Sequence, residues 1–375
     1  MRGQWIGDFE GNTSGIAVIE LDDLGNQYEG TAAGFPTQAG ANVPPIYADL
    51  RIPKNDTARE FDIELSLQAI DPSSATPVPW EAIAHQFPGL SFESQLKTHW
   101  EFDSENNLHI KWRAQSGEQG QALLYPGRAN QLSEFKVEAH ISTWSEFKEF
   151  AVAQEPDRYV FRGQESNKWR LRTHFHRMGR FNLRRFVGHD IQVLHGNLSS
   201  MTQHLFNLND TLQNAAFYSL VQHHGYPTPL LDWTHSPFIS AFFAYRNLRK
   251  ENRSEDGFVR IFVLDRREWQ RDVMPLSVLS PAPPHFSFLS PLSINNPRLV
   301  PQQAISSVTN VDDIEALISH ASLRNRKTYL RVIDLPASER PVVMQELALM
   351  GITAGSLFPG LDGACEQLKE RLFEL

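Results

Sequence analysis

The chain has 375 residues, of which 41% are hydrophobic and 21% are charged. This composition is typical of globular proteins and excludes a disordered, collagen-like or coiled-coil chain. The length exceeds what one hydrophobic core usually fills, so we expect two domains. The lone cysteine, Cys365, excludes an intramolecular disulfide and a cysteine-based zinc site. The sequence has neither a secretory signal nor eighteen consecutive apolar residues, which predicts a cytoplasmic protein with no membrane partner.

The net charge of −9 is unevenly distributed along the chain. Residues 1–135 hold 8 basic against 19 acidic residues, whereas the remainder is nearly neutral. An acidic first part argues against nucleic acid or an anionic membrane as its own partner, and a local basic site can lie only in the second part. None of the recognised metal-binding spacings, such as HExxH, occurs among the histidines, so we predict no metal site.

Residues 1–135 are predicted to form an all-β accessory or sensor domain. The run GIAVIELDD leads into the turn-forming pair Gly25-Asn26, and residues 61–67 alternate apolar and polar side chains, as a half-solvated antiparallel strand does. We expect a small sandwich or barrel. The proline-rich stretch 71–90 is predicted to be a long surface loop.

Residues 136–375 are predicted to form an α+β domain, because helical and strand patterns mix there without strict alternation. Thr143 and Glu146 form a capping-box pattern at the start of the first helix. The proline-rich stretch 273–310 is expected to be a long irregular connection. Further helices are predicted at 182–207, 210–223, 237–248 and 362–373, and strands at 158–162, 258–264 and 328–334.

The segment 158–185 concentrates positive charge, with nine basic residues against a single acid. Arg162 ends a short apolar strand and precedes Gly163, where a backbone turn and a ligand can approach closely. Its planar guanidinium suits bidentate capture of phosphate or of ribose hydroxyls, and the alternative is a structural arginine that bonds carbonyl groups. For residues 177–185 the alternative is a basic helix paired with the acidic first domain.

A second cluster of polar residues lies at 232–236, before a predicted helix with Pro237 at its first position. Thr234 or Ser236 can cap this helix, and Asp232 stands nearby. Free amides and the helix dipole favour an anionic or strongly polar ligand at such an end. The alternative for Asp232 and Thr234 is a capping role alone.

Four separated motifs occur in the second half of the chain: VFRGQ at 160–164, QHHGYPTPLLDWTHSPFISAFFA at 222–244, NPRLVPQQA at 296–304 and GITAGSLFPGLDG at 351–363. They closely resemble those of the FRG domain, a bacterial domain named after a Phe-Arg-Gly tripeptide. The resemblance covers about residues 140–375 and extends over four motifs in the order that the family shows. The layout of this domain is similar to that of the ADP-ribosyltransferase fold, so an α+β domain of that type is implied.

The resemblance implies roles for particular residues. In the ADP-ribosyltransferase fold, an arginine on the first core strand binds the ribose of NAD, and a Ser/Thr motif after the next helices shapes the nicotinamide pocket. Arg162 matches the first role, Thr234 with Ser236 matches the second, and Arg298 would orient phosphate. The residues expected to bind NAD are Arg162, Gly163, Gln164, Asp232, Thr234, Ser236 and Arg298.

The catalytic position departs from the pattern of that fold. A late strand should supply a glutamate, whereas Gln302 occupies the matching motif and Glu346 is the nearest acidic substitute. A carboxylate stabilises the positive charge that develops on the ribose when the nicotinamide bond breaks, which an amide does far less well. A site with Gln302 would therefore bind NAD and transfer slowly or not at all.

These observations leave three expected functions open. The first is a transferase or glycohydrolase that uses NAD, with Arg162, Gln302 and Glu346 at the reacting centre. Such an enzyme would suit a bacterial toxin or anti-phage effector. The second is a module that binds or processes nucleic acid. The third is a non-catalytic domain that binds a nucleotide-type small molecule. The nucleic-acid function would use five aromatic residues as stacking platforms: Phe161, Trp169, Phe175, Phe181 and Phe186.

Overall fold

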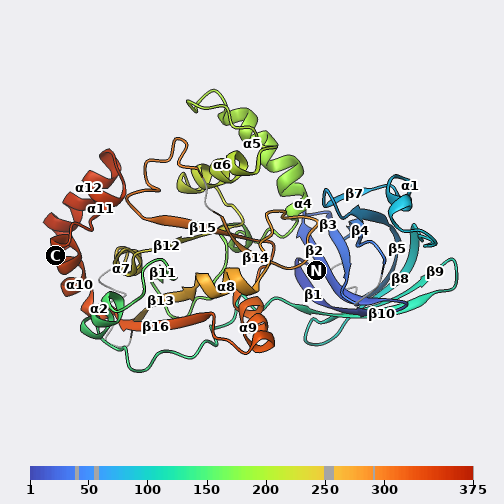
Figure 1. Ribbon diagram of the computed structural model, residues 1–375, viewed down its shortest axis with the longest axis horizontal. Helices are drawn as coiled ribbons and strands as arrows, with labels where there is room; N and C mark the ends of the chain where they lie inside the picture. The colour runs from blue at the N-terminus through green and yellow to red at the C-terminus, as the bar shows by residue number, and fades with distance from the viewer. Residues whose placement is uncertain (39–41, 55–58, 249–256, 290–291, 375) are drawn as a thin grey trace.

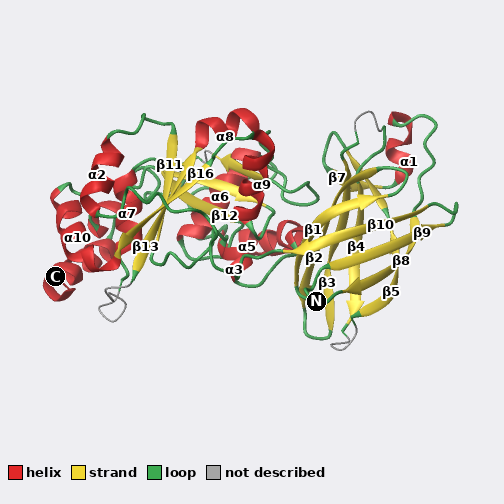
Figure 2. Ribbon diagram, turned by 90° about the horizontal axis from the view of Figure 1, so that it is seen from below, coloured by secondary structure: helices red, strands yellow, loops and turns green. Residues whose placement is uncertain are grey.

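Two β-sheets organise the molecule, one in each half of the chain (Figures 1 and 2). A computed structural model describes residues 1–38, 42–54, 59–248, 257–289 and 292–374. The first half is a large, curled, antiparallel sheet, and the second combines helices with a smaller sheet. The predicted change from an all-β to a mixed pattern along the chain is therefore confirmed.

The first sheet has ten strands in the order β5-β8-β9-β10-β1-β2-β3-β4-β6-β7. It curls around a core that includes Trp5, Trp100 and Phe102, all of them buried. Gly25 has the positive φ of +92° that the turn between β2 and β3 requires. The strands are β1 (Gly3–Glu10), β2 (Ser14–Asp23), β3 (Gln27–Pro36), β4 (Ile46–Pro53), β5 (Glu60–Ser66), β6 (Gln68–Asp71), β7 (Thr76–Val78), β8 (Gln95–Phe102), β9 (Leu108–Ala114) and β10 (Gln119–Pro126).

The stretch 71–90 is more ordered than the sequence predicts. It contains β7 and the short helix α1 (Trp80–Ile83), followed by a 3-10 turn at Ala84–Gln86. The rings of Trp80 and Phe92 stack with their centroids 5.1 Å apart. Aromatic packing thus orders a segment whose prolines favour a loop.

The second sheet is antiparallel, with six strands in the order β14-β15-β12-β11-β13-β16. Its strands are β11 (Tyr159–Gln164), β12 (Leu230–Thr234), β13 (Phe258–Asp265), β14 (Phe286–Leu289), β15 (Ala304–Thr309) and β16 (Leu330–Pro336). The longer helices around it are α2 (Trp144–Val152), α5 (Ile191–Leu198), α6 (Thr211–His223), α7 (Pro237–Tyr245), α8 (Arg266–Asp272), α9 (Ile314–Asn325), α10 (Arg340–Leu349) and α12 (Leu361–Lys369). The shorter ones are α3 (His174–Arg177), α4 (Leu183–Arg185) and α11 (Ala354–Leu357).

Helices cover both faces of this sheet. Helices α2, α7 and α10 pack on one face and α8 and α9 on the other. Strand β13 accordingly buries Ile261 against the first group and Phe262 against the second. Among the residues placed by the structure, no helix combines the length and apolar character that crossing a membrane requires.

Two predicted segments differ from the structure. The stretch 273–310 contains β14 and β15, although residues 290 and 291 lie outside the described part. Ser306 and Ser307 of β15 are buried, and such polar residues hide a strand from its sequence pattern. The helical region predicted at 182–207 already ends at Leu198, after a π-helical turn at Phe186–Asp190.

Acidic residues of the first sheet pair with arginines of the basic segment 177–185. Asp22 of β2 is buried and accepts a 2.6 Å hydrogen bond from Arg180 Nε. Glu29 of β3 accepts a 3.4 Å bond from Arg185 Nη1. The prediction that the basic residues of 177–185 pair with the acidic first domain is confirmed for these two arginines.

Glu20 makes the stability of the folded chain depend on pH. Its carboxyl is buried and accepts a bond from Gln4 Nε2 at 2.9 Å. Burial raises the pKa of Glu20 from 4.5 to about 8, with the neighbouring Asp22 adding to the shift. The folded state therefore holds this proton more tightly than the unfolded state, so the stabilisation is complete below pH 4.5 and is lost as the pH rises through about 8.

Glu20→Gln should remove this dependence, because the amide keeps an acceptor for Gln4 and never ionises. Urea unfolding between pH 5 and 8 should show the native chain losing at least about 1 kcal/mol more than the variant. Glu10→Gln, at an exposed position of β1, is the matched control. Parallel pH profiles for the native chain and Glu20→Gln would contradict the prediction.

Candidate functional site

Arg162 lies on β11, the strand between β12 and β13 in the second sheet. Strands β11 and β12 pair only at Phe161 and Thr234, so the Arg162 side chain reaches the neighbouring backbone. Its Nη1 donates a 2.6 Å hydrogen bond to the carbonyl oxygen of Asp232, while its buried Nε has no partner among the described residues. Burial lowers the pKa of Arg162 to about 10, and the charge of Asp232 opposes that shift.

A cavity of about 500 Å³ lies beside Arg162. Its size falls in the range of small-molecule sites in proteins. The end of β11 supplies part of its wall, and α7 supplies Phe243. The residues that line it are Ala129, Asn130, Gln131, Arg162, Gly163, Gln164, Glu165, Lys168, Trp169, Arg170, Arg172, Arg177 and Phe243.

The cations of the cavity differ in their pairing. Buried Arg170 donates to Asp313 at 3.0 Å, and Arg172 forms a bidentate contact with Asp312. Lys168 and Arg177 reach the surface, and their side chains form no hydrogen bond or ion pair within the part of the chain that the structure places. Partial burial and the nearby charge of Arg172 lower the pKa of Arg177. Lys168 and Arg177, with Arg162, thus remain available to an anion.

A polar group around His223 links two further motifs. Asn296 Nδ2 donates to His223 Nδ1 at 2.6 Å, so Nδ1 is the acceptor and the ring proton sits on Nε2. Burial lowers the pKa of His223 and so favours the neutral ring, although the charge of Asp232 partly offsets this shift. Arg298 Nη1 donates to the His223 carbonyl oxygen at 3.0 Å.

The fourth motif joins this group through Phe358. The Arg298 guanidinium lies 5.4 Å from the centre of the Phe358 ring, within the range of cation–π contacts. Phe243, which lines the cavity, packs edge to face on the same ring with the centroids 6.0 Å apart. Segments around residues 162, 223–232, 296–298 and 358 therefore assemble into one neighbourhood in the fold.

The comparisons with known proteins match one segment in this half of the chain. Residues 157–253 match the sequence model of the FRG domain. The C-terminal part of the chain carries an FRG domain. No curated protein matches the sequence. A solved structure of a redesigned β-barrel aligns with 34% of this chain and 90% of its own at 8% identity and a TM-score of 0.23, a likeness too weak to carry an argument.

Thr234 and Ser236 of the FRG domain are occupied by structural hydrogen bonds. Thr234 Oγ1 donates to the Gln302 carbonyl oxygen at 2.8 Å and accepts from the Ser236 backbone N–H at 3.1 Å. Ser236 Oγ accepts a hydrogen bond from the Ile239 N–H, so Ser236 is the N-cap of α7, as predicted. Neither residue is among the described residues that line the cavity beside Arg162.

The residues expected at the reacting centre lie elsewhere in the second half of the chain. The Gln302 side chain is buried, and its Nε2 donates to the Leu357 carbonyl oxygen at 3.0 Å. Glu346 accepts from Trp144 Nε1 and Lys148 Nζ at 2.8 and 2.6 Å, in the contact between α2 and α10. The structure brings neither side chain to the cavity wall that it describes.

Gly163 and Gln164 do lie at the cavity. A Cβ at Gly163 would stand 1.9 Å from the Ser240 carbonyl oxygen, so glycine is required for α7 to pack on β11. The buried Gln164 Oε1 has no partner in the described structure. Gln164 and Arg162 therefore each have one buried, unsatisfied polar atom in a side chain that lines the cavity.

Several contributors were not singled out from the sequence. Arg177 and Phe243 enter the cavity wall from α3 and α7, although their sequence contexts indicate a surface charge and a core ring. Asn296 fixes the His223 ring from a loop more than seventy residues away. Only their place within the FRG motifs could have drawn attention to Phe243 and Asn296, and no local signal marks Arg177.

Proposed function

We propose that the FRG domain binds a nucleotide-type ligand in the cavity beside Arg162, with NAD as the first ligand to test. The observation that carries the proposal is the buried Arg162 Nε, which lacks a partner next to an open cavity of about 500 Å³. Arg162 is half-buried and lines the cavity, and a phosphate or ribose oxygen there would compensate for the incomplete hydrogen bonding of its guanidinium.

The charge of the cavity supports an anionic ligand. Lys168 and Arg177 stand at its wall with Arg162, while Arg170 and Arg172 are neutralised by carboxylates. Burial lowers the pKa values of both Arg162 and Arg177, so an added negative charge there would favour their charged forms. One or two phosphate groups meet this demand.

Two aromatic rings support a base-bearing ligand. Trp169, which is 52% exposed, and Phe243 both line the cavity. An exposed tryptophan beside free cations suits a purine or pyridine ring, since stacking on an aromatic face is worth about 1–3 kcal/mol per base. Phosphate and base together define a nucleotide.

Cleavage of NAD is a second candidate, favoured by the Glu165 carboxylate at the same cavity. In that reaction the glycosidic C–N bond breaks, nicotinamide leaves with the bonding electrons, and water or an acceptor hydroxyl adds to the ribose and loses a proton. A carboxylate would stabilise the charge on the ribose. Glu165 Oε1 now accepts from Asn247 Nδ2 at 3.0 Å. A role as toxin or anti-phage effector stays a prediction.

The nucleic-acid alternative has less support in this geometry. Its stacking platforms were predicted wrongly for Phe161, Phe175, Phe181 and Phe186, because all four rings are buried in hydrophobic cores or contacts. Trp169 is the exception. Arginines of the same segment that would contact phosphates are instead paired with acidic residues, as described above.

Arg162→Ala should weaken binding of NAD and ADP-ribose roughly 10- to 100-fold, the loss expected for a charge-assisted hydrogen bond. Calorimetric titration of the full chain measures this, and the melting temperature without ligand shows whether the variant is folded. Arg184→Ala is the matched control, because Arg184 is exposed and lines a different surface hollow. Equal affinity in the native chain and Arg162→Ala would overturn the proposal.

Release of nicotinamide separates the two candidates. A chain that binds NAD, shifts its melting temperature and frees no nicotinamide has a binding function. Nicotinamide release that disappears in Glu165→Gln, with NAD affinity retained, would instead establish cleavage at this cavity.

A further inference from the structure

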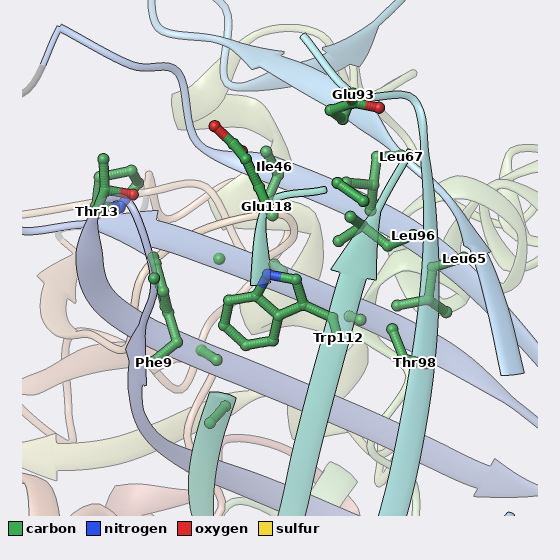
Figure 3. Close-up of a pocket in the computed structure, with 18 of the residues that line it drawn as sticks. Phe9, Thr13, Ile46, Leu65, Leu67, Glu93, Leu96, Thr98, Trp112 and Glu118 are labelled. Carbon is green, nitrogen blue, oxygen red and sulfur yellow. The ribbon is translucent and has the colours of Figure 1, made fainter. Parts of the chain in front are cut away.

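The curled N-terminal sheet encloses a second cavity, unrelated to the FRG domain. Its volume is about 250 Å³, and its wall is mainly apolar. Figure 3 shows Phe9 and Trp112 on one side, Leu65, Leu67 and Leu96 on the other, and Glu93 and Glu118 near the rim. Curled sheets of this size have room inside for one small ligand.

Small residues create this space. At one end the interior is filled by Trp5, Phe102 and their neighbours. At the other end Ala17, Ala32 and Ala122 face the same interior, where larger side chains would be needed to fill it. Since interiors are normally packed to high density, the open volume is a feature of the residue choice along these strands.

The apolar side chains around the cavity are left incompletely covered. Phe9, Leu67, Leu96 and Trp112 are only partly buried although they point into the curl of the sheet. An apolar molecule in the cavity would cover them, and each square ångström removed from water would contribute roughly 25 cal/mol. The body of the ligand is therefore expected to be hydrocarbon or aromatic.

The rim supplies charge of one sign. Glu93 and Glu118 are the charged residues lining the cavity, and no lysine, arginine or histidine joins them in the described wall. Glu93 accepts from the Ser116 N–H at 3.1 Å and Glu118 from the Asn12 amide, both uncharged donors. Residues 39–41, which follow the wall residue Pro36, are Ala-Gly-Ala and add no charge. The carboxylates thus lack a counter-ion within the described part of the chain.

We propose that this cavity binds a small organic cation, with an apolar body among the inward-facing rings and leucines and an ammonium head at Glu93 and Glu118. The rings of Phe9 and Trp112 pack edge to face with centroids 6.3 Å apart, and aromatic faces add to the attraction for an ammonium group. The excess of acidic residues in 1–135 favours approach of a cation over that of an anion.

Three probes of matched size test this on the full chain: 4-phenylbutylamine, 4-phenylbutan-1-ol and 4-phenylbutyrate. Calorimetric titration at low salt should give the amine at least tenfold higher affinity than the carboxylate, with the alcohol between them. Added salt should reduce the difference in affinity between the amine and the alcohol. Equal or tighter binding of the carboxylate, or no binding of any probe, would overturn the proposal.

Two sets of variants test whether the probes bind in this cavity and whether the two glutamates cause the preference for the amine. Glu93→Gln with Glu118→Gln should lower amine affinity to that of the alcohol, and Glu64→Gln, at an exposed position of β5, should leave it unchanged. Ala32→Leu and Ala122→Leu fill the cavity at different strands and should each abolish binding of every probe. Full amine affinity in both folded cavity-filling variants would place the binding elsewhere and contradict the inference.

Discussion

Replacing Asp22 with alanine is expected to lower the free energy of unfolding by roughly 3–5 kcal/mol, the cost of breaking a buried ion pair by removing one partner. The Asp22 side chain is 2% exposed. Besides Arg180 Nε it accepts the backbone N–H groups of Phe181 and Asn182 at 2.5 and 3.2 Å. Alanine leaves all three donors unmet where the two halves of the chain meet. We expect a loss near the lower end of this range, because Arg180 is 36% exposed and water can hydrate its guanidinium in the variant.

Asp23 provides a matched control for this prediction. It follows Asp22 on the same strand, but its carboxylate is near the surface and pairs with Lys54 at 2.9 Å. Surface pairs contribute little, so Asp23→Ala should leave the urea midpoint almost unchanged. Similar losses in the two variants would show that Asp22 does not hold the halves together.

Gly163→Ala is expected to destabilise the chain by about 3 kcal/mol, the upper end of the usual cost of overpacking. The added Cβ would lie 1.9 Å from the Ser240 carbonyl oxygen and 2.8 Å from the Ala244 amide nitrogen. Both are backbone atoms of α7, so no side chain can swing away to make room. Thermal and urea unfolding measure the loss.

Gly196→Ala is the control, since Gly196 lies within α5 and its Cβ would meet nothing within 4 Å. Alanine there should stabilise the helix by roughly 0.5–1 kcal/mol. Stability of Gly163→Ala equal to that of the native chain would mean that α7 does not need its close approach to β11.

The three residues that name the FRG domain thus have different physical roles. Phe161 is buried and packs with α7 in the core. Arg162 presents an unpaired donor beside the cavity, and Gly163 lets the helix approach. Changes at the three positions should therefore separate into effects on stability and effects on ligand affinity.

Local signals in the sequence predicted much of the fold. The capping box of Thr143 and Glu146 is present at the start of α2, and Ser236 caps α7 ahead of Pro237. The alternation in residues 61–67 gives β5 its inward Leu65. Each of these signals depends on neighbours within a few residues, which the sequence displays directly.

Features that depend on distant partners could not be predicted in this way. Strand β15 carries buried serines, and Ser307 Oγ accepts a 3.0 Å bond from Trp233 Nε1. The sequence of β15 is therefore as polar as that of a loop, and its strand structure is explained only by the contacts with β12. The hydroxyl of Thr234 looked available to a ligand, but the Gln302 carbonyl oxygen occupies it. The pairing of Arg170 and Arg172 with acids some 140 residues later likewise has no local sign.

Photoaffinity labelling with 8-azido-ADP tests most directly whether the cavity beside Arg162 is the nucleotide site. Mass spectrometry of the digested full chain should find the label on peptides that carry Trp169 or Phe243, the rings of that cavity. Unlabelled NAD should suppress this labelling, and Arg162→Ala should strongly reduce it, in line with its weaker binding. Label confined to the N-terminal sheet or to the hollow around Tyr226 and Val300, unchanged in Arg162→Ala, would contradict the account.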